Sequence, residues 1–257
     1  MLWIEAQSTA VITLLAFTIC YMLTGAIFWF ASILSHRAIA RELKGVAPVT
    51  LTPLGVILGL VIAFLASRVW TNLDRAGEYV GQEASALRET ALLANSLPPD
   101  VSRDVRQAIR KHVHFLEANE WPAMARQQAN LQTIPGGLTE ALSAVLSFAS
   151  VQSNQRVAQE RAVVAIEQAL QARRNRIRLS QAEIAPIQWI IIIVLAALVL
   201  LTLALIHIHD RVAMAVTMFI FSTAVAICLV LLMVYDRPFG AGGFVIQPTV
   251  LRDVVPN

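Results

Sequence analysis

Charged residues, cysteines and catalytic motifs are all scarce in this sequence. Only 14% of the 257 residues are charged and 57% are hydrophobic, whereas soluble domains carry about 25% charged residues. The chain is therefore predicted to be an integral membrane protein. Its two cysteines, Cys20 and Cys228, lie inside apolar runs, which excludes a disulfide framework. The net charge of +3 involves no basic run interleaved with aromatic residues, so we expect no nucleic-acid partner.

Motifs of catalysis and of metal binding are missing as well. The sequence holds no glycine-rich phosphate loop, CxxC pair, HExxH motif or nucleophile–base set, so we expect neither an enzyme nor a cofactor. His112 and His114 lie two residues apart on a predicted helix and point in different directions, which makes them a poor chelate. His207, His209 and Asp210 are interpreted as a polar turn, with a metal or pH-sensing site as the alternative. We predict no metal.

Four apolar stretches are long enough to cross a bilayer. They cover residues 9–34, 52–70, 187–207 and 212–235. Thr52 and Pro53 are suited to the N-cap and first position of the second helix, and Pro186 is suited to start the third. The interiors of the spans hold no ionisable residue, which argues against a proton-coupled carrier. These stretches predict two transmembrane hairpins, residues 1–70 and 186–235.

Residues 71–185, between the second and third spans, are predicted to form a helical domain. Apolar residues recur there at spacings of three or four, namely Ala76, Val80, Ala84, Leu87, Ala91 and Ala94. Nothing interrupts the chain after Trp70, so the second span is expected to continue as one helix to Pro98 and Pro99. The predicted fold is therefore an all-α membrane protein with four transmembrane helices and a helical domain between helices two and three.

The rest of this domain is predicted from caps and breaks. Asp100 or Ser102 is expected to cap a second helix, and a third helix is expected from about Thr139 to Ser180. Residues 236–257 are predicted to be an extended tail.

Arginines gather near the span ends on the side that holds the N-terminus and the helical domain. By the positive-inside bias, this side is predicted to be cytoplasmic. Four of the arginines directly precede the third span, namely Arg173, Arg174, Arg176 and Arg178. We expect them either to contact anionic lipid headgroups or only to mark the topology.

A stripe of small residues runs along the second span. Gly55, Gly59, Ala63 and Ser67 recur at every fourth position, so they form a continuous groove on a helix. The groove either packs against another helix of the same chain or lines a narrow pore around a symmetry axis. Phe64 is the one aromatic residue inside this span. Arg68 would stand at the cytoplasmic end of such a pore and attract anions, or it extends to the headgroups.

Three sequence features together resemble a known family. The first is PLGVILGLVIAFLASRVW followed by EASAL, which begins at Glu83, and the second is EWP at Glu120, Trp121 and Pro122. The third is YDRPFGAGGFVIQP, in which Asp236, Arg237, Pro238, Phe239 and Gly240 directly follow the last span. In order and spacing, these features are similar to the bacterial bestrophin-like membrane proteins. The alternative is that the EWP and DRPFG motifs have only structural roles.

The resemblance implies a function that composition alone does not. Bestrophins are pentameric anion channels with four spans and a pore lined by the second, so we expect a homo-oligomer, first a pentamer, in the bacterial inner membrane. Its partners would be further copies of itself, membrane lipids and permeating ions. Calcium-gated bestrophins carry an acidic cluster after the last span, whereas here only Asp236 is present. A cation-selective channel and a non-conducting scaffold that binds a partner through its helical domain are the alternatives.

Overall fold

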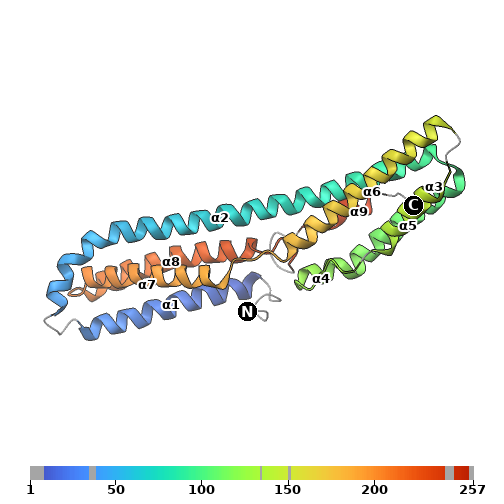
Figure 1. Cartoon of the computed structure of the whole chain (residues 1–257). Helices are drawn as coiled ribbons and strands as arrows, with labels where there is room; N and C mark the ends of the chain where they lie inside the picture. Colours follow the sequence, from blue (N-terminus) through green and yellow to red (C-terminus); the bar gives the residue numbers. More distant parts are fainter. Residues whose placement is uncertain (1–8, 35–38, 134, 150–151, 241–245, 255–257) are drawn as a thin grey trace. The chain divides into compact units, whose positions relative to one another are not determined.

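The structure, a computed structural model, describes residues 9–34, 39–133, 135–149, 152–240 and 246–254, and within 39–46 only the backbone. Every regular element in this part of the chain is a helix (Figure 1). The chain divides into two compact units. Unit 1 comprises Met1–Thr71 and Glu183–Asp236, and unit 2 comprises Asn72–Ala182 and Arg237–Asn257.

Four helices are long and apolar enough to cross a membrane. Three of them lie wholly in unit 1, namely α1 (Thr9–Leu34), α7 (Pro186–Ile206) and α8 (Arg211–Tyr235). The fourth is α2 (Ile39–Leu93), whose apolar part precedes Arg68. Pro186 is the first residue of α7, where its missing N–H costs nothing. Asp210 caps α8, because its carboxylate accepts hydrogen bonds from the backbone N–H groups of Val212 and Ala213.

Helix α2 begins earlier than the sequence predicts. Thr52 and Pro53 do not start it, because α2 already begins at Ile39 and includes both Pro48 and Pro53. Proline removes a backbone hydrogen bond, which in water would end most helices. In a membrane helix, neighbouring groups compensate for this loss, so proline is tolerated there. The bend near the N-terminal end of α2 (Figure 1) is the expected effect of prolines within a helix.

Hydroxyl groups join helices α1 and α8 inside the apolar unit. The Thr24 hydroxyl donates to Ser222 Oγ at 2.8 Å, and the Tyr21 and Thr223 hydroxyls lie 3.0 Å apart. The Tyr21 ring also stacks on Phe219, with centroids 5.4 Å apart. Such bonds replace the hydrophobic driving force that is weak between helices in lipid. Around them, Leu58, Leu65 and Val69 of α2 pack against α7 and α8 in a buried cluster.

Unit 2 is a bundle built on the second half of α2. The other elements are the short 3₁₀ turn η2 (Ala94–Ser96), α3 (Pro99–Phe115), the π turn η3 (Leu116–Glu120), α4 (Trp121–Ala125), α5 (Gly136–Ser147) and α6 (Ser153–Ser180). The predicted apolar face of α2 is confirmed, since the residues from Ala76 to Ala94 named above are all buried. Small alanines on this face let the neighbouring helices approach closely.

Two predictions about helix boundaries in unit 2 are wrong. Neither Asp100 nor Ser102 is the N-cap of α3, because Pro98 takes that place and Pro99 is the first helical residue. The fixed φ of proline suits that position. The single helix predicted from Thr139 to Ser180 is two helices, α5 and α6. The Gln159 side chain stabilises the end of α5 by donating to the carbonyl of Val145 at 2.7 Å.

The C-terminal tail is folded rather than extended. Its described part contains a short helix, α9 (Thr249–Arg252), and buries Phe239, Leu251 and Val254 in the core of unit 2. The Arg252 side chain also pairs with Glu117 of η3 at 2.5 Å. The prediction of an extended tail is therefore wrong for these residues, because apolar side chains beyond the turn at Gly240 are buried against the helices. Residues 241–245 and 255–257 lie outside the described part.

The start of α5 touches the backbone of α3. A Cβ atom on Gly137 would lie 2.5 Å from the Ala108 carbonyl oxygen and 2.7 Å from the His112 nitrogen. We therefore expect Gly137→Ala to force the two helices apart and to lower the free energy of unfolding by about 1–3 kcal/mol. Guanidinium unfolding of the detergent-solubilised protein, followed by circular dichroism, measures this change.

The adjacent glycine provides the matched control for this prediction. A Cβ on Gly136 meets only the flexible end of Glu140, at 3.7 Å. Gly136→Ala should therefore leave the unfolding midpoint unchanged or raise it slightly. A Gly137→Ala variant as stable as Gly136→Ala would contradict the close approach of α3 and α5.

Candidate functional site

The small-residue stripe of α2 faces away from its own chain. Gly55, Gly59, Ala63 and Ser67 are all exposed, and nothing lies within 4 Å of a Cβ built on either glycine. The opposite side of the helix carries the residues that are buried in unit 1. The sequence left open whether this stripe packs against another helix of the same chain. Among the described residues, it does not. The stripe is an unoccupied surface of one subunit.

The other two residues expected near a pore lie differently. Phe64 is 68% exposed and adds a large apolar side chain to the open side of α2. Arg68 is one residue beyond Ser67, about 100° further around the helix, and its guanidinium lies 3.4 Å from the Gln188 side-chain oxygen on α7. Arg68 therefore points away from the line of small residues, toward the start of α7.

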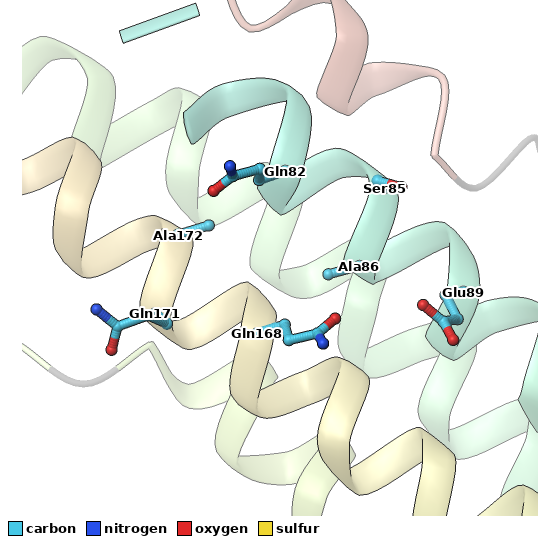
Figure 2. A pocket seen from close by; sticks show the side chains of 7 residues that line it. All are labelled: Gln82, Ser85, Ala86, Glu89, Gln168, Gln171 and Ala172. Carbon is cyan, nitrogen blue, oxygen red and sulfur yellow. The ribbon is translucent and has the colours of Figure 1, made fainter. Parts of the chain in front are cut away.

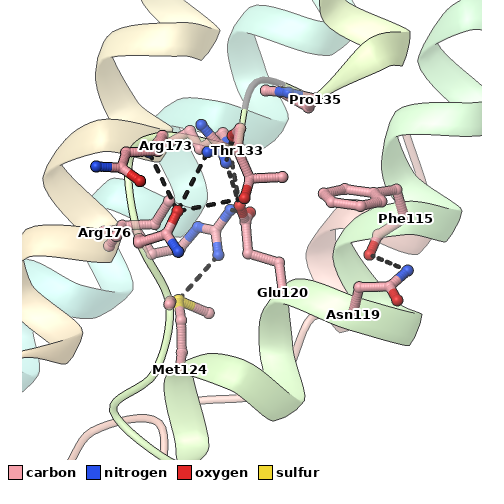
Figure 3. A network of polar contacts seen from close by, with 12 residues as sticks. Phe115, Asn119, Glu120, Met124, Thr133, Pro135, Arg173 and Arg176 are labelled. Carbon is pink, nitrogen blue, oxygen red and sulfur yellow. Dashed lines mark hydrogen bonds and ion pairs between the residues drawn. The ribbon is translucent and has the colours of Figure 1, made fainter.

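Unit 2 contains a cluster of buried charges that joins three elements. Arg176 of α6 is fully buried and pairs with Glu83 of α2 and with Glu120 of η3, at 2.8 Å in each case. The Arg173 side chain, 4% exposed, pairs with Glu120 at 2.6 Å and donates to the Thr133 carbonyl at 2.8 Å. Figure 3 shows Glu120 held between the two arginines. We call Glu83, Glu120, Arg173 and Arg176 the buried charge cluster.

The two carboxylates and two guanidiniums of this cluster balance in charge. Isolated buried charges would be very unfavourable, but pairing and hydrogen bonding offset the cost of desolvation. Burial opposes the ionisation of Glu83, yet the nearby Arg176 guanidinium and the hydrogen bond to His112 outweigh it, so the pKa of Glu83 falls to about 2. Glu83 is therefore ionised throughout the physiological range.

His112 of α3 adds a fourth element to the cluster. Its Nε2 lies 3.1 Å from Glu83 Oε1, and both side chains are fully buried. Because an ionised carboxylate can only accept, Nε2 is assigned as the donor nitrogen. Its Nδ1 has no hydrogen-bond partner within the described part of the chain. The sequence prediction that His112 and His114 do not chelate a metal together stays a prediction, but His112 has a different role, as a partner of Glu83.

Aromatic residues of two sequence motifs close the cluster on one side. The Arg176 guanidinium lies 5.2 Å from the centroid of the Trp121 ring, a cation–π distance. Trp121 in turn packs edge-to-face on Phe239, with centroids 5.5 Å apart. Glu120 and Trp121 of the EWP motif and Phe239 of the DRPFG motif therefore meet in the core of unit 2. Pro122 follows at the second position of α4.

The remaining residues of the DRPFG motif organise the chain after α8. The Asp236 carboxylate accepts a hydrogen bond from the backbone N–H of Ile184, just before α7, at 3.1 Å. Gly240 N–H donates to the Arg237 carbonyl at 3.1 Å, and Ile246 N–H to the Pro238 carbonyl at 3.0 Å. The last two bonds form a turn at the start of the tail, within unit 2.

The expected lipid contact of the four arginines holds for at most two of them. Arg173 and Arg176 are 3% and 0% exposed, so they cannot reach headgroups, and this part of the prediction is wrong. Their side chains lie on the face of α6 that packs into unit 2, where they form ion pairs with Glu83 and Glu120. Arg174 and Arg178 are exposed, and for them headgroup contact stays a prediction.

Comparisons with known proteins agree with this architecture. The family model of the bestrophin-like domain matches residues 18–251, so the chain belongs to the bestrophin-like family, and the resemblance seen in the sequence is confirmed. No curated protein matches the chain. The prediction of an all-α membrane protein with four apolar helices is confirmed, whereas the side of the membrane on which the helical domain lies stays a prediction.

Solved structures share the fold at low identity. A crystal structure described as a membrane protein has a TM-score of 0.67 and 16% identity, covering 93% of this chain and 97% of that chain. A variant of a bacterial bestrophin homologue from Klebsiella pneumoniae has a TM-score of 0.66 and 16% identity, covering 94% and 96%. A second variant of that homologue has a TM-score of 0.63 and 14% identity, covering 96% and 98%.

The buried charge cluster makes a specific prediction for stability. Arg176→Met removes the guanidinium shared by Glu83 and Glu120, and uncompensated buried charge costs about 3–5 kcal/mol. The exposed neighbour Arg174 provides the control, because Arg174→Met removes the same group from the surface. We expect guanidinium unfolding of the solubilised protein at neutral pH to show a large loss for Arg176→Met and almost none for Arg174→Met.

The same variants have a signature in acid. The ordinary pKa of Glu83 is 4.5 and the folded value is about 2, so its contribution to stability is complete above about pH 4.5 and is lost as the pH falls toward 2. Without Arg176, burial opposes the ionisation of Glu83 with no arginine to offset it. Protonation should then relieve the unpaired carboxylate, so the stability deficit of Arg176→Met relative to the wild type should shrink as the pH falls. Parallel pH profiles of the wild type and Arg176→Met would contradict the assignment.

Proposed function

We propose that this protein is a homo-oligomeric ion channel that conducts passively, with α2 of each copy lining the pathway. The observation that carries the proposal is the small-residue stripe of α2, which is exposed and has no partner among the described residues of its own chain. Leucine would be cheaper to insert in lipid than glycine, so small residues facing outward call for a reason. Helices clustered around an axis supply one, because small residues permit close approach and a narrow lumen.

Membership of the bestrophin-like family supports the proposal, and it favours a channel over an enzyme. Subunit number is proposed as five, which is what the resemblance to bestrophins implies. An apolar lining is no obstacle, since hydrophobic constrictions can gate by dewetting. The alternative of a non-conducting scaffold required span two to pack within one subunit. The open stripe counts against that alternative.

The proposed location is the bacterial inner membrane, with the N-terminus and unit 2 in the cytoplasm. This orientation follows from the positive-inside bias of the arginines near the span ends. In that arrangement, the exposed Arg178 lies in the last turn of α6 and the exposed Arg174 one turn further back. We propose that these two side chains contact anionic lipid headgroups.

Selectivity for anions is the first candidate, because the chain resembles the bestrophin anion channels. Selectivity for cations is the second. The observation that favours cations is a pair of acidic residues on α2 within unit 2. Asp74 and Glu78 are exposed and lie opposite the buried face of the helix that contains Ala76, Val80 and Leu87. If α2 surrounds the pathway, these carboxylates face it, whereas Arg68 is directed to Gln188.

Blocking the stripe tests the proposed pathway. We expect Gly59→Trp to reduce ion flux through reconstituted liposomes to the level of empty liposomes, because five indoles would fill a lumen that glycine leaves open. Gly25→Trp on α1 is the matched control, since nothing lies within 4 Å of a Cβ there either, and it should conduct like the wild type.

Comparing the two variants tests whether α2 lines the ion pathway. A Cβ meets nothing within 4 Å at either glycine, so we expect both variants to fold and a difference between them to report on the assembly. Equal conductance of Gly59→Trp and Gly25→Trp would remove α2 from the pathway. Absence of any ion flux through the wild-type protein would contradict the channel proposal itself.

Reversal potentials in asymmetric KCl separate the two selectivities. A potential near the chloride equilibrium value indicates an anion channel, and one near the potassium value a cation channel. In either case we expect Asp74→Asn with Glu78→Gln to shift the potential toward chloride, because negative charge has left the entrance. The shift should shrink at high salt.

A control variant removes a carboxylate elsewhere on unit 2. Glu160 of α6 is exposed and pairs with Arg156 four residues earlier, so Glu160→Gln should leave the reversal potential unchanged. No shift in the Asp74→Asn, Glu78→Gln variant would show that this face of α2 does not border the ion pathway.

A further inference from the structure

Helices α2 and α6 leave a polar groove between them on one face of unit 2. The groove has a volume of about 290 Å³. Its polar lining comes from Gln82, Ser85 and Glu89 on α2 and from Gln168 and Gln171 on α6. Figure 2 shows these side chains around the gap between the two ribbons, with the green segments of the chain behind them. Two alanines in the lining leave the room that larger side chains would fill.

The chemistry of this groove fits a guanidinium group. Amide and hydroxyl oxygens accept hydrogen bonds, Glu89 supplies a negative charge, and the lining contains no cation. Among the described residues, the side chains of Glu89 and Gln168 make no hydrogen bond or ion pair. A planar guanidinium offers five N–H donors and is weakly hydrated, so it is the cation best suited to a shallow site of several acceptors.

A complementary surface lies on helix α3. Its outward face carries Arg103, Gln107, Arg110 and His114, spaced four, three and four residues apart. This face is opposite the one that buries Val105 and Ile109. Two other basic residues of α3 are paired within the chain, Arg106 with Asn95 and Lys111 with Glu140.

Two arginines of this face are available to another molecule. Arg103 and Arg110 are exposed, and their side chains have no hydrogen-bond or ion-pair partner in the described part of the chain. Arg110 stands at the middle of the face, with Gln107 and His114 one turn to either side. It is therefore the arginine best placed to enter a groove on a neighbouring surface.

We propose that the groove between α2 and α6 binds Arg110 of a neighbouring copy of this chain. The groove and the α3 face are different surfaces of unit 2, so each copy offers one and accepts the other. Contacts of this heterologous kind close into a ring when the rotation between neighbouring copies closes, as the proposed oligomer requires. The inference rests on the proposed homo-oligomeric channel, and it adds the contact that orders the copies outside the membrane. Electrostatic complementarity of this kind fixes the register of partners more than it adds affinity.

Directed cross-linking tests this contact. Cys20 and Cys228 are first replaced by alanine, and two differently tagged full-length chains are then co-expressed, one with Glu89→Cys and the other with Arg110→Cys. A short bis-maleimide cross-linker spans the two side-chain lengths of an ion pair, which a disulfide does not. Added to the membranes, it should give a dimer that carries both tags, in severalfold excess over a control mixture. The control pairs Arg110→Cys with Glu160→Cys, which places the cysteine at an exposed glutamate of α6 two turns from Gln168.

A charge exchange provides an independent readout. Glu89→Arg and Arg110→Glu should each weaken association of the solubilised subunits by about two- to fivefold, the range for a partly exposed ion pair. Native mass measured across a dilution series reports this change. The double variant should recover association, because the pair is restored with its charges exchanged. A structural role of either residue within one chain would give no such recovery.

The outcomes separate this inference from the proposed function. An intact, conducting assembly without the mixed cross-link and without recovery in the double variant overturns the inference and leaves the channel standing. Cross-linked dimers formed equally by the control mixture also overturn it, since they report only random collision. Monomers that pass no ions overturn the proposed function first. Mixed dimers together with recovery support the contact.

Discussion

The fold of unit 2 depends on how the guanidinium of Arg176 is neutralised. Moving a charged group out of water costs several kcal/mol even after relaxation, so a fully buried arginine is stable only where its donors are satisfied. Glu83, Glu120 and the Met124 sulfur surround it, at 2.8, 2.8 and 3.1 Å. Because these partners come from α2, η3 and α4, the side chain fixes the register of three elements against α6.

The rotation of α2 follows from this constraint and from the alanine face beside it. With Glu83 turned toward Arg176, the neighbouring Ala76, Val80 and Leu87 also face the core of unit 2, and the carboxylates of Asp74 and Glu78 face outward. In unit 1 the same helix buries Leu58, Leu65 and Val69 and leaves its glycines open. In each unit, α2 thus packs one side against its own chain and leaves the other side exposed.

Periodicity in the sequence predicted these faces, but not the partners of the charges. The alanine spacing of α2 is sufficient to predict a buried face. The run from Arg173 to Arg178, by contrast, predicts a single basic patch when only its composition is considered. Helix geometry separates it, since Arg173 and Arg176 share a face with Ala165, Ala169 and Ala172, which are buried. His112 likewise continues the buried face of Val105 and Ile109. A charged residue within an apolar helix face indicates a buried charge. Its partner cannot be predicted from local spacing, because Glu83 lies 93 residues from Arg176 in the sequence.

Charged side chains rather than hydrocarbon at the centre of unit 2 hold α2 in one orientation. A purely apolar core of small alanines tolerates rotation and sliding, because one alanine contact resembles the next. A buried Glu83–Arg176 pair does not, since a shift of one residue carries the carboxylate about 100° around α2 and leaves two charges unpaired, at a cost of about 3–5 kcal/mol. We infer that the cluster is retained for orientation rather than for net stability. For a channel, that orientation decides which atoms of α2 the ions meet.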